Sequence, residues 1–466
     1  MVRGLTSLGV PLALAGALVA SGCAPVGPNY TRPPVLTPPA YRFVDTPQQA
    51  ASLADLPWWQ VFEDPSLQAL VREAIANNLD LQAAVARLER ARAEAGIAKS
   101  FLYPQVDATG TYTVQQNLGG EGAADDVQHG GLYGFQLSWE LDLFGRIRRE
   151  HEAAFARMLA SEQGRRGVLV TLVGDVASTY FLLRQLDLEL DIARRTLSNN
   201  DQTVTLFENR LNGGLSNRLE VDRIRANRAV TAASIPDLEQ LIARTENAVS
   251  LLLGRAPGPI MRTPLGSELP PPLIPPGLPA SLLERRPDVV AAEELLHAAN
   301  ADVGAARALF FPTIRLTGLL GAISGDLTSL LGGSGAVWSA GPSVLQPLFR
   351  GGRLRSNLEA AQATFDEAMA QYRRAALNAY REVANAIVTI DTLANVRVER
   401  ETAVAALEDA ADLSRARYDA GLASYLEILT ADQDLFREQV LLAQARGAEL
   451  QARAELYRAL GGGWQP

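Results

Sequence analysis

Two stretches decide the fold: residues 96–110 read GIAKSFLYPQVDATG, and residues 304–318 read GAARALFFPTIRLTG. Their shared Gly, Pro and Thr-Gly positions lie 208 residues apart. A second pair, RLNGGLSNRLEV at 210–221 and RYDAGLASYLEI at 417–428, repeats at a spacing of 207 residues. Between them, LFGRIR at 143–148 resembles LFRGGRLR at 348–355. Three matches in the same order predict two structural halves built on one plan, with a period too long for a solenoid.

Each half has the same predicted order of elements: a helix, two strands, a very long helix, a turn and a returning helix. The first helix, residues 66–101, is rich in good helix formers and ends before Pro104. The two repeats cover 66–253 and 284–460, with the proline-rich linker 254–283 between them and the tail 461–466 after them. The predicted strands are 105–116, 132–143, 313–322 and 337–349, and the later helices are 147–211, 217–253, 353–418 and 424–460.

The strands carry a period of two. From Tyr133 to Asp142, apolar residues alternate with polar or small ones over about ten positions, which is the length and pattern of a membrane-barrel strand. Such a strand turns its apolar residues to lipid and its polar residues to the lumen. A half-buried sheet in a soluble domain shows the same pattern, so the strands alone leave both readings open.

The long helices predict an elongated architecture. Neither 147–211 nor 353–418 contains proline, and apolar residues recur along both in steps of three and four, the pattern of coiled-coil packing. About 65 residues at 1.5 Å per residue make a rod of roughly 100 Å. Glycine-containing turns at 212–214 and 419–421 then reverse the chain, so each half is expected to end in an antiparallel helical hairpin.

The N-terminus predicts export and a lipid anchor. Arg3, an apolar run and small residues before Cys23 make residues 1–22 a signal peptide. A cysteine directly after Gly22 fits lipoprotein cleavage, with Cys23 as the lipidated residue; the alternative is an ordinary signal peptide and an unmodified cysteine. Residues 23–65 are interpreted as a lipid anchor, a proline-rich extended tether and an equatorial segment.

Several classes of function are excluded by composition. The net charge of −9 leaves no basic excess for nucleic acid. Three widely spaced histidines and one cysteine do not make a metal site, and the sequence has no nucleophile motif or phosphate-binding loop. Arg286 beside Pro287 and Asp288 reads as a helix start rather than as a catalytic ion pair. We therefore expect no enzyme activity, metal or cofactor.

Four predicted strands cannot close a barrel, and unpaired strand edges cannot lie in lipid. Several chains must therefore share one barrel, most simply around a rotation axis. Two chains would give eight strands and a filled interior, whereas three would give twelve and begin to leave a passage.

Several motifs occur in the order found in one known family. They are GCAPVGPNY at 22–30, WWxxFxDP at 58–65, LLERRPDV at 282–289, ANA at 299–301, FP at 311–312 and RYxxG at 417–421. On these motifs the chain resembles the outer-membrane factor (TolC-like) family, in particular the lipoprotein branch that works with resistance-nodulation-division pumps. The resemblance covers essentially the whole mature chain. It implies a mainly α homotrimer with a 12-stranded membrane β-barrel, four strands per chain, that continues into a long α-helical periplasmic barrel.

The resemblance also implies a gate and a docking site at the periplasmic tip. By position, Leu426 matches an apolar constriction, Glu427 and Thr430 match positions where relatives place aspartates, and Asp432 can supply charge that Thr430 lacks. For each gate residue the alternative is a solvated helix face, and for the tip it is a bare turn. The residues expected at the tip for adaptor docking are Gly213, Gly214, Leu215, Arg417, Tyr418, Gly421 and Leu422.

The resulting hypothesis is an outer-membrane channel subunit of a tripartite efflux system that exports small molecules such as drugs. Its expected partners are two further copies of the chain, a periplasmic adaptor (membrane fusion) protein, an inner-membrane pump and outer-membrane lipid. Two alternatives stay open: an exit duct for type I protein secretion, and a non-conducting structural envelope lipoprotein.

Overall fold

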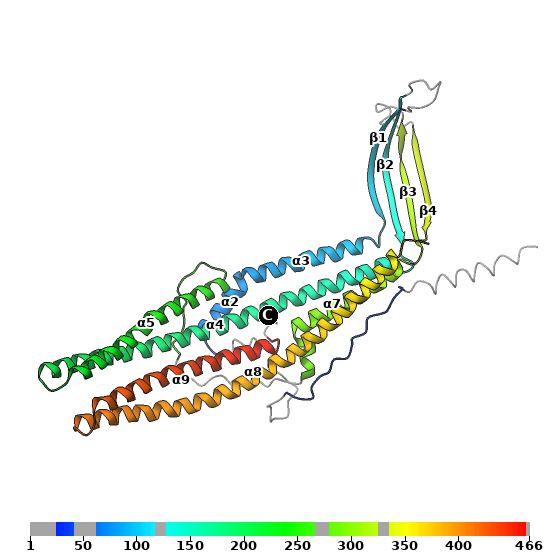
Figure 1. The fold of residues 1–466 in the computed structure, drawn as a ribbon. Helices are drawn as coiled ribbons and strands as arrows, with labels where there is room; N and C mark the ends of the chain where they lie inside the picture. Colours follow the sequence, from blue (N-terminus) through cyan, green and yellow to red (C-terminus); the bar gives the residue numbers. More distant parts are fainter. Residues whose placement is uncertain (1–24, 42–61, 117–126, 266–278, 325–334, 463–466) are drawn as a thin grey trace, which may run out of the picture. The chain divides into compact units, whose positions relative to one another are not determined.

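The computed structural model describes residues 25–41, 62–116, 127–265, 279–324 and 335–462 (Figure 1). The signal peptide, Cys23 and the Trp58-Trp59 motif lie outside these ranges. The helices and strands are α2 (Pro65–Asn77), α3 (Leu79–Ser100), β1 (Gln105–Gln116), β2 (Val127–Leu141), α4 (Arg146–Asn212), α5 (Arg218–Leu252), η3 (Pro279–Ser281), α6 (Leu282–Arg285), α7 (Pro287–Ala308), β3 (Thr313–Ser324), β4 (Ala336–Leu345), α8 (Arg353–Asp419) and α9 (Tyr425–Ala459).

The helix predicted at 66–101 is wrong as a single element, because the structure divides it at Asn78. The backbone of Asn78 is extended, and its side chain accepts the N–H of Leu81 at 2.9 Å while donating to the carbonyl of Leu252 at 2.9 Å. Asn78 thus ends α2, caps α3 and ties both to the end of α5. In the second repeat α6 and α7 likewise replace one helix, and Pro287 begins α7.

Three strands also have bounds that differ from the prediction. Strand β2 is 127–141 rather than 132–143, because Asp142 leaves the sheet and accepts the N–H groups of Ile147 and Arg148 at the start of α4. Strand β3 runs to Ser324 rather than to 322. Strand β4 is 336–345 rather than 337–349, and Pro347, just beyond it, has no N–H to give to a sheet.

The chain divides into two compact units, each described here by itself. The strand unit comprises the described parts of Met1–Pro34, Arg87–Glu162 and Ala291–Arg373. Its four strands form an antiparallel meander in the order β1-β2-β3-β4 (Figure 1). Because β2 pairs with β3 over Gly131–Leu141, one sheet joins the two repeats. Within the described residues, β1 and β4 are edge strands whose outer sides meet no other strand.

The register gives the sheet one continuous apolar face. Paired residues in an antiparallel ladder share a face, and here Ala108 pairs with Phe135, Phe135 with Leu320, and Leu320 with Trp338. Phe135, Leu320 and Trp338 are all exposed in the single chain. The opposite face carries polar and charged positions such as Asp107 opposite Gln136, and Glu140 opposite Arg315. The sheet therefore exposes an apolar surface that spans all four strands.

An N-terminal strap, residues 25–34, packs on the helices of the strand unit. Val26 donates its N–H to the carbonyl of Phe144 at 2.9 Å, and Asn29 accepts a hydrogen bond from Arg149 at 2.7 Å. Tyr30 stacks on His297 with ring centroids 4.6 Å apart. Gly27 has a φ of +104°, and a Cβ there would lie 2.5 Å from the Cα of Gly304 in α7. The strap reaches α7 so closely because neither glycine has a side chain.

The hairpin unit comprises the described parts of Val35–Ala86, Gln163–Val290 and Arg374–Pro466. In it α4 reverses into α5, and α8 reverses into α9 (Figure 1). Its core is an apolar cluster contributed by α2, α4, α5 and α9, which includes Leu67, Phe181, Val249 and Ala454. By length and composition α4 is the one described helix that could cross a membrane, but half of its most apolar stretch is buried inside the protein. Burial of this kind is typical of a core helix in a bundle.

Candidate functional site

Both hairpins turn through the same backbone geometry at their tips. Gly214 and Gly421 have φ angles of +70° and +71°, which lie in the left-handed region that favours glycine. The next residue, Leu215 or Leu422, donates its N–H to the carbonyl of Arg210 or Arg417 at 2.8 Å. These bonds force each leucine outward, and the two side chains are 81% and 71% exposed. Together with Gly213, these turns present two apolar side chains at the ends of the hairpins.

Behind the turns, an aromatic cluster joins the two hairpins. Phe207 of α4 lies with its ring centroid 4.3 Å from that of Tyr425 and 5.9 Å from that of Tyr418. Arg210 donates a hydrogen bond of 2.6 Å to the Tyr418 hydroxyl, with its guanidinium 5.2 Å from the ring centroid. Val221, Ile224, Ile428 and Leu429 complete the cluster. Tyr418 therefore connects the hairpins of the two repeats within one chain.

The two repeats use equivalent glutamates differently. Glu220, in the first repeat, accepts from the Ser216 hydroxyl at 2.7 Å and takes part in a capping box with Asn217. Its counterpart Glu427 has no such neighbour, because Ala423 replaces the serine. Glu427 instead accepts a hydrogen bond of 3.0 Å from Arg417. The predicted gate carboxylate is thus held in an ion pair within its own hairpin.

The other expected gate residues occupy the first two turns of α9. Leu426 is 51% exposed. Thr430 donates its hydroxyl to the carbonyl of Leu426 at 2.9 Å, so it makes only a bond within its own helix here. Asp432 accepts a hydrogen bond of 2.7 Å from Arg415 of α8. Burial raises the pKa of the Asp432 carboxyl above its usual value, and Arg415 opposes that shift.

The raised pKa of Asp432 predicts a stability difference that depends on pH. A folded pKa above the unfolded value means that the ionised carboxylate costs stability at neutral pH, and that this cost disappears as pH falls through the raised pKa. We expect the urea unfolding midpoint of the wild type to rise relative to the midpoint of Asp432→Asn as the pH is lowered. The check is a series of urea titrations of both proteins, followed by circular dichroism. A difference between them that stays constant with pH would contradict this expectation.

Two arginines in this site were missed from the sequence, and each has a signal in it. Arg210 is the repeat equivalent of Arg417, and it bonds Tyr418, 208 residues away. The reciprocal partner of Arg417 would be Leu211, which has no hydroxyl, so Arg417 turns to Glu427. Arg415 lies on the same face of α8 as Asp412, to which it also donates at 3.0 Å. The repeat alignment points to Arg210 as the equivalent of Arg417, but the pair Arg415–Asp432, which joins α8 and α9 within one hairpin, depends on the three-dimensional register of the two helices.

The model of the outer membrane efflux protein family matches the chain twice, over residues 70–255 and 278–462. The chain belongs to the outer membrane efflux protein family. Its two matches coincide with the two repeats. This outer membrane efflux protein is 32% identical to the probable outer membrane lipoprotein SilC of Salmonella typhimurium over 97% of the chain and 98% of the relative. It is 34% identical to the cation efflux system protein CusC of Escherichia coli over 96% of the chain and 97% of CusC.

A solved structure, that of the outer-membrane channel OprN, is similar to this outer membrane efflux protein with a TM-score of 0.88 and 32% identity. The match covers 95% of the chain and 100% of OprN. The protein is thus an efflux component of the outer membrane that extends into the periplasm, as predicted, with the two-fold repeated, mainly α fold that the sequence indicated.

Proposed function

We propose that three copies of the chain form one conducting outer-membrane channel with a 12-stranded barrel. The observation that carries this is the sheet of the strand unit, whose apolar face spans all four strands while β1 and β4 keep free outer edges. An open edge in lipid leaves backbone N–H and C=O groups unpaired at a cost of several kcal/mol each. Pairing of β4 in one copy with β1 in the next removes both edges, and three copies leave a polar lumen.

A lipid on Cys23 would anchor the barrel at its base. The strap begins at Pro25, two residues after Cys23, and Val26 bonds Phe144 directly after β2 ends. Because the strap meets the strand unit beside the end of β2, a lipid attached two residues before the strap would lie near that end of the strands. Acyl chains at about 0.8 kcal/mol per buried methylene would hold that end in the outer membrane.

The tip is proposed as the gate and as the docking site for an adaptor. Leu426, Glu427, Thr430 and Asp432 would line the constriction, and the ion pairs Arg417–Glu427 and Arg415–Asp432 would hold it in the closed arrangement. The outward Leu215 and Leu422, with Gly213, Gly214, Gly421, Arg417 and Tyr418, would meet a periplasmic adaptor protein. The adaptor would then connect the channel to an inner-membrane pump.

The cargo is proposed to be small molecules. CusC is named for cation efflux, and TtgC of Pseudomonas putida, 33% identical over the whole chain, is named as an efflux pump outer membrane protein. Both names support efflux by a pump over type I protein secretion. Loss of drug resistance without loss of a secreted protein in a deletion strain would separate these two.

Conductance tests the proposal directly. We expect the purified protein to have the mass of three chains in mild detergent and to give discrete conducting steps in planar bilayers. Because Cys23 is the only cysteine, paired cysteines introduced into β1 and β4 report strand pairing between copies without interference once Cys23 is replaced by serine. A monomer that gives no conductance and forms no β1–β4 cross-links would overturn both the trimer and the channel, and would favour the structural-lipoprotein alternative.

Tyr418→Phe is expected to open the gate partly. It removes the hydroxyl that accepts from Arg210 but keeps the ring in the aromatic cluster. A hydrogen bond of about 1 kcal/mol corresponds to about a fivefold rise in the conducting fraction, measured in planar bilayers. Thr205→Ala is the matched control, since Thr205 is exposed on α4, lies outside the proposed gate, and bonds the Asp201 carbonyl of its own helix through its hydroxyl. Equal conducting fractions for Tyr418→Phe and the wild type would contradict the assignment.

A further inference from the structure

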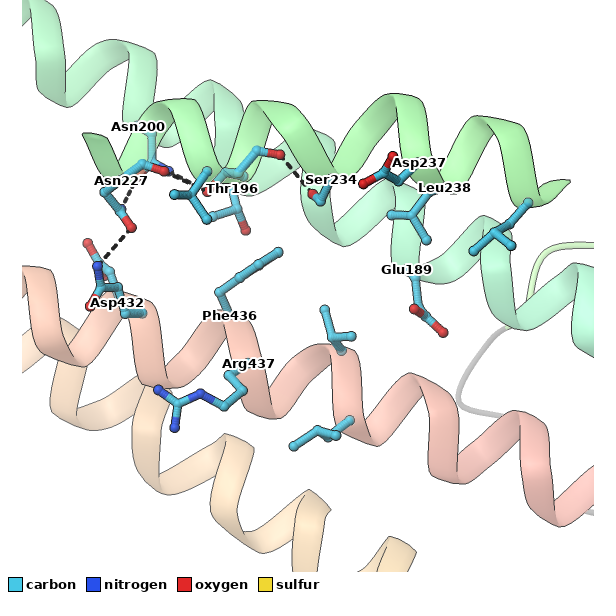
Figure 2. A pocket seen from close by; sticks show the side chains of 16 residues that line it. Glu189, Thr196, Asn200, Asn227, Ser234, Asp237, Leu238, Asp432, Phe436 and Arg437 are labelled. Atoms are coloured by element: carbon cyan, nitrogen blue, oxygen red, sulfur yellow. Dashed lines mark hydrogen bonds between the residues drawn. The ribbon is translucent and has the colours of Figure 1, made fainter. Parts of the chain in front are cut away.

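A cavity of about 570 Å³ lies within the hairpin unit, between the α4–α5 hairpin and α9 (Figure 2). Its volume falls in the range of pockets that hold drug-sized molecules. Figure 2 shows Phe436 pointing from α9 towards α5, across the cavity from Leu238. The apolar lining is Val230, Leu238, Leu241, Phe436, Val440 and Leu441.

Hydrogen bonds, two of them between the hairpins and one within the α4–α5 hairpin, flank the cavity on both sides. On the tip side, Gln433 of α9 donates to Asn227 of α5 at 3.0 Å, and Asn200 of α4 donates to Thr231 at 3.2 Å (Figure 2). On the other side, Gln444 of α9 donates to Glu189 of α4 at 3.3 Å. The apolar space is therefore framed by polar contacts that keep the two hairpins at a fixed separation.

Glu189 is a buried carboxylate without a counter-ion. It is 6% exposed, and two neutral amides donate to it, those of Gln185 at 2.8 Å and Gln444 at 3.3 Å. Among the described residues no arginine or lysine forms an ion pair with it. Figure 2 shows its side chain pointing from α4 towards α9, into the cavity. A buried charge without a partner is costly, so a cation placed beside it would be favoured.

The other charged residues around the cavity also favour the binding of a cation. Asp432 is already paired with Arg415, and Arg437 is paired with Asp434 at 2.8 Å. Asp237 lies on the rim and, within the part of the chain that the structure describes, has no basic partner. After these pairs are set aside, the described residues leave the cavity with two carboxylates that have no ion-pair partner, the buried Glu189 and the exposed Asp237, and with no unpaired basic side chain in its lining.

We propose that this cavity is a binding site for a drug-sized lipophilic monocation, whose apolar body fills the space between Leu238 and Phe436 and whose charge is neutralised by Glu189. The site lies inside one chain, and its lining reaches the proposed gate residue Asp432 at the end nearer the tip. It goes beyond the proposed channel function and does not depend on trimer formation or conductance. A ligand held there would bridge α4, α5 and α9, and would thus stabilise the separation of the two hairpins that the unliganded protein already has.

A matched pair of ions tests the proposal. Tetraphenylphosphonium and tetraphenylborate have nearly the same size and shape but opposite charge. We expect the full-length protein in detergent to retain tetraphenylphosphonium in equilibrium dialysis above a protein-free micelle blank, and to retain no tetraphenylborate. Glu189→Gln keeps the shape and one acceptor oxygen for the neighbouring amides but removes the charge, and is expected to weaken tetraphenylphosphonium binding at least tenfold. Leu238→Trp fills the cavity, and is expected to abolish binding.

Glu239→Gln is the control variant. Glu239 is next to Leu238 on α5 but is exposed and already paired with Arg194 at 2.7 Å. We expect it to bind tetraphenylphosphonium as the wild type does. Equal retention of the two ions, no retention of tetraphenylphosphonium by the wild type, or binding that survives both Glu189→Gln and Leu238→Trp would each overturn the proposal. Because dialysis needs no conductance, failure here is distinguishable from failure of the channel proposal.

Discussion

Asp64→Ala is expected to destabilise the hairpin unit by about 4 kcal/mol, the scale of removing one partner from a buried ion pair. Asp64 is 7% exposed and accepts from the Tyr180 hydroxyl at 2.7 Å, the Arg184 guanidinium at 3.2 Å and the Thr263 hydroxyl at 3.0 Å. It also accepts the N–H groups of Ser66 and Leu67 as the N-cap of α2. One carboxylate thus fastens α2, α4 and the segment that links the repeats.

The loss is large because the remaining groups cannot reach water. Burial and the hydrogen bond to Asp64 raise the pKa of Tyr180 to about 12, so Tyr180 stays a neutral donor across the physiological range. Without Asp64, the Tyr180 hydroxyl and the Arg184 charge would lie in the core with fewer partners. Tyr180→Phe removes a single donor and is expected to cost only about 1 kcal/mol. In the double variant Asp64→Ala/Tyr180→Phe, the loss of unfolding free energy should be smaller than the sum of the two single losses, because both substitutions remove the same Tyr180–Asp64 hydrogen bond.

Urea unfolding followed by far-UV circular dichroism measures both effects. Asp222→Ala is the control, because that carboxylate is exposed and its pair with Arg218 at 3.5 Å lies on the surface. We expect it to change the free energy of unfolding by less than about 0.5 kcal/mol. A loss for Asp64→Ala no larger than that of Asp222→Ala would show that the network carries no stability.

Much of this fold could be predicted because its signals are periodic. The repeat at 208 residues, the heptads along α4 and α8, and the alternation along β2 each report a local geometry that the sequence repeats many times. The glycine turns at 214 and 421 could be predicted because few other residues adopt a positive φ. The family motifs then gave the assembly, which no single chain contains.

The remainder depends on single contacts between distant segments. In the sequence Asn78 is an ordinary residue within a predicted helix. In the structure its side chain bonds the carbonyl of Leu252, 174 residues away, and the helix is divided there. The place of Asp64 directly before Pro65 is typical of a helix cap, but its bonds to Tyr180 and Thr263 are set by tertiary packing. Glu189 lies in a helical repeat of charged and apolar residues, and only the structure shows that it is buried without a cation. Such contacts occur once and so leave no periodic trace.

Gly27→Ala is expected to release the N-terminal strap from the strand unit. With φ at +104°, an added Cβ carries the strain of a left-handed backbone, about 1–2 kcal/mol, and it would also lie 2.5 Å from the Cα of Gly304. Backbone on backbone cannot relax by a rotamer change, so the total cost is about 3 kcal/mol. The strap would then give up the Val26–Phe144 and Asn29–Arg149 hydrogen bonds rather than distort α7.

Chymotrypsin cleavage after Tyr30 reports strap release. In the docked strap Tyr30 stacks on His297 and donates to Glu293 at 3.3 Å, so the site is protected. A cost of about 3 kcal/mol raises the population of the open strap, and thus the cleavage rate, about a hundredfold when opening is fast relative to cleavage. Mass spectrometry of the full-length protein in detergent gives that rate. Gly304→Ala changes the other glycine of this contact, and its Cβ would lie 3.0 Å from Arg149 and from the Val26 carbonyl. It should also raise the rate of cleavage after Tyr30.

Gly96→Ala separates strap release from a general effect of removing glycine. Gly96 lies in α3 of the same unit, and an added Cβ there meets nothing within 4 Å. Alanine in a helix is favoured over glycine by about 1 kcal/mol, so this variant should be slightly more stable and should be cleaved after Tyr30 at the wild-type rate. If Gly27→Ala and Gly304→Ala were also cleaved at that rate, the glycine contact would not be what holds the strap. A lipid anchor of the kind proposed at Cys23 would then connect to the strands through a segment that the helices do not fix.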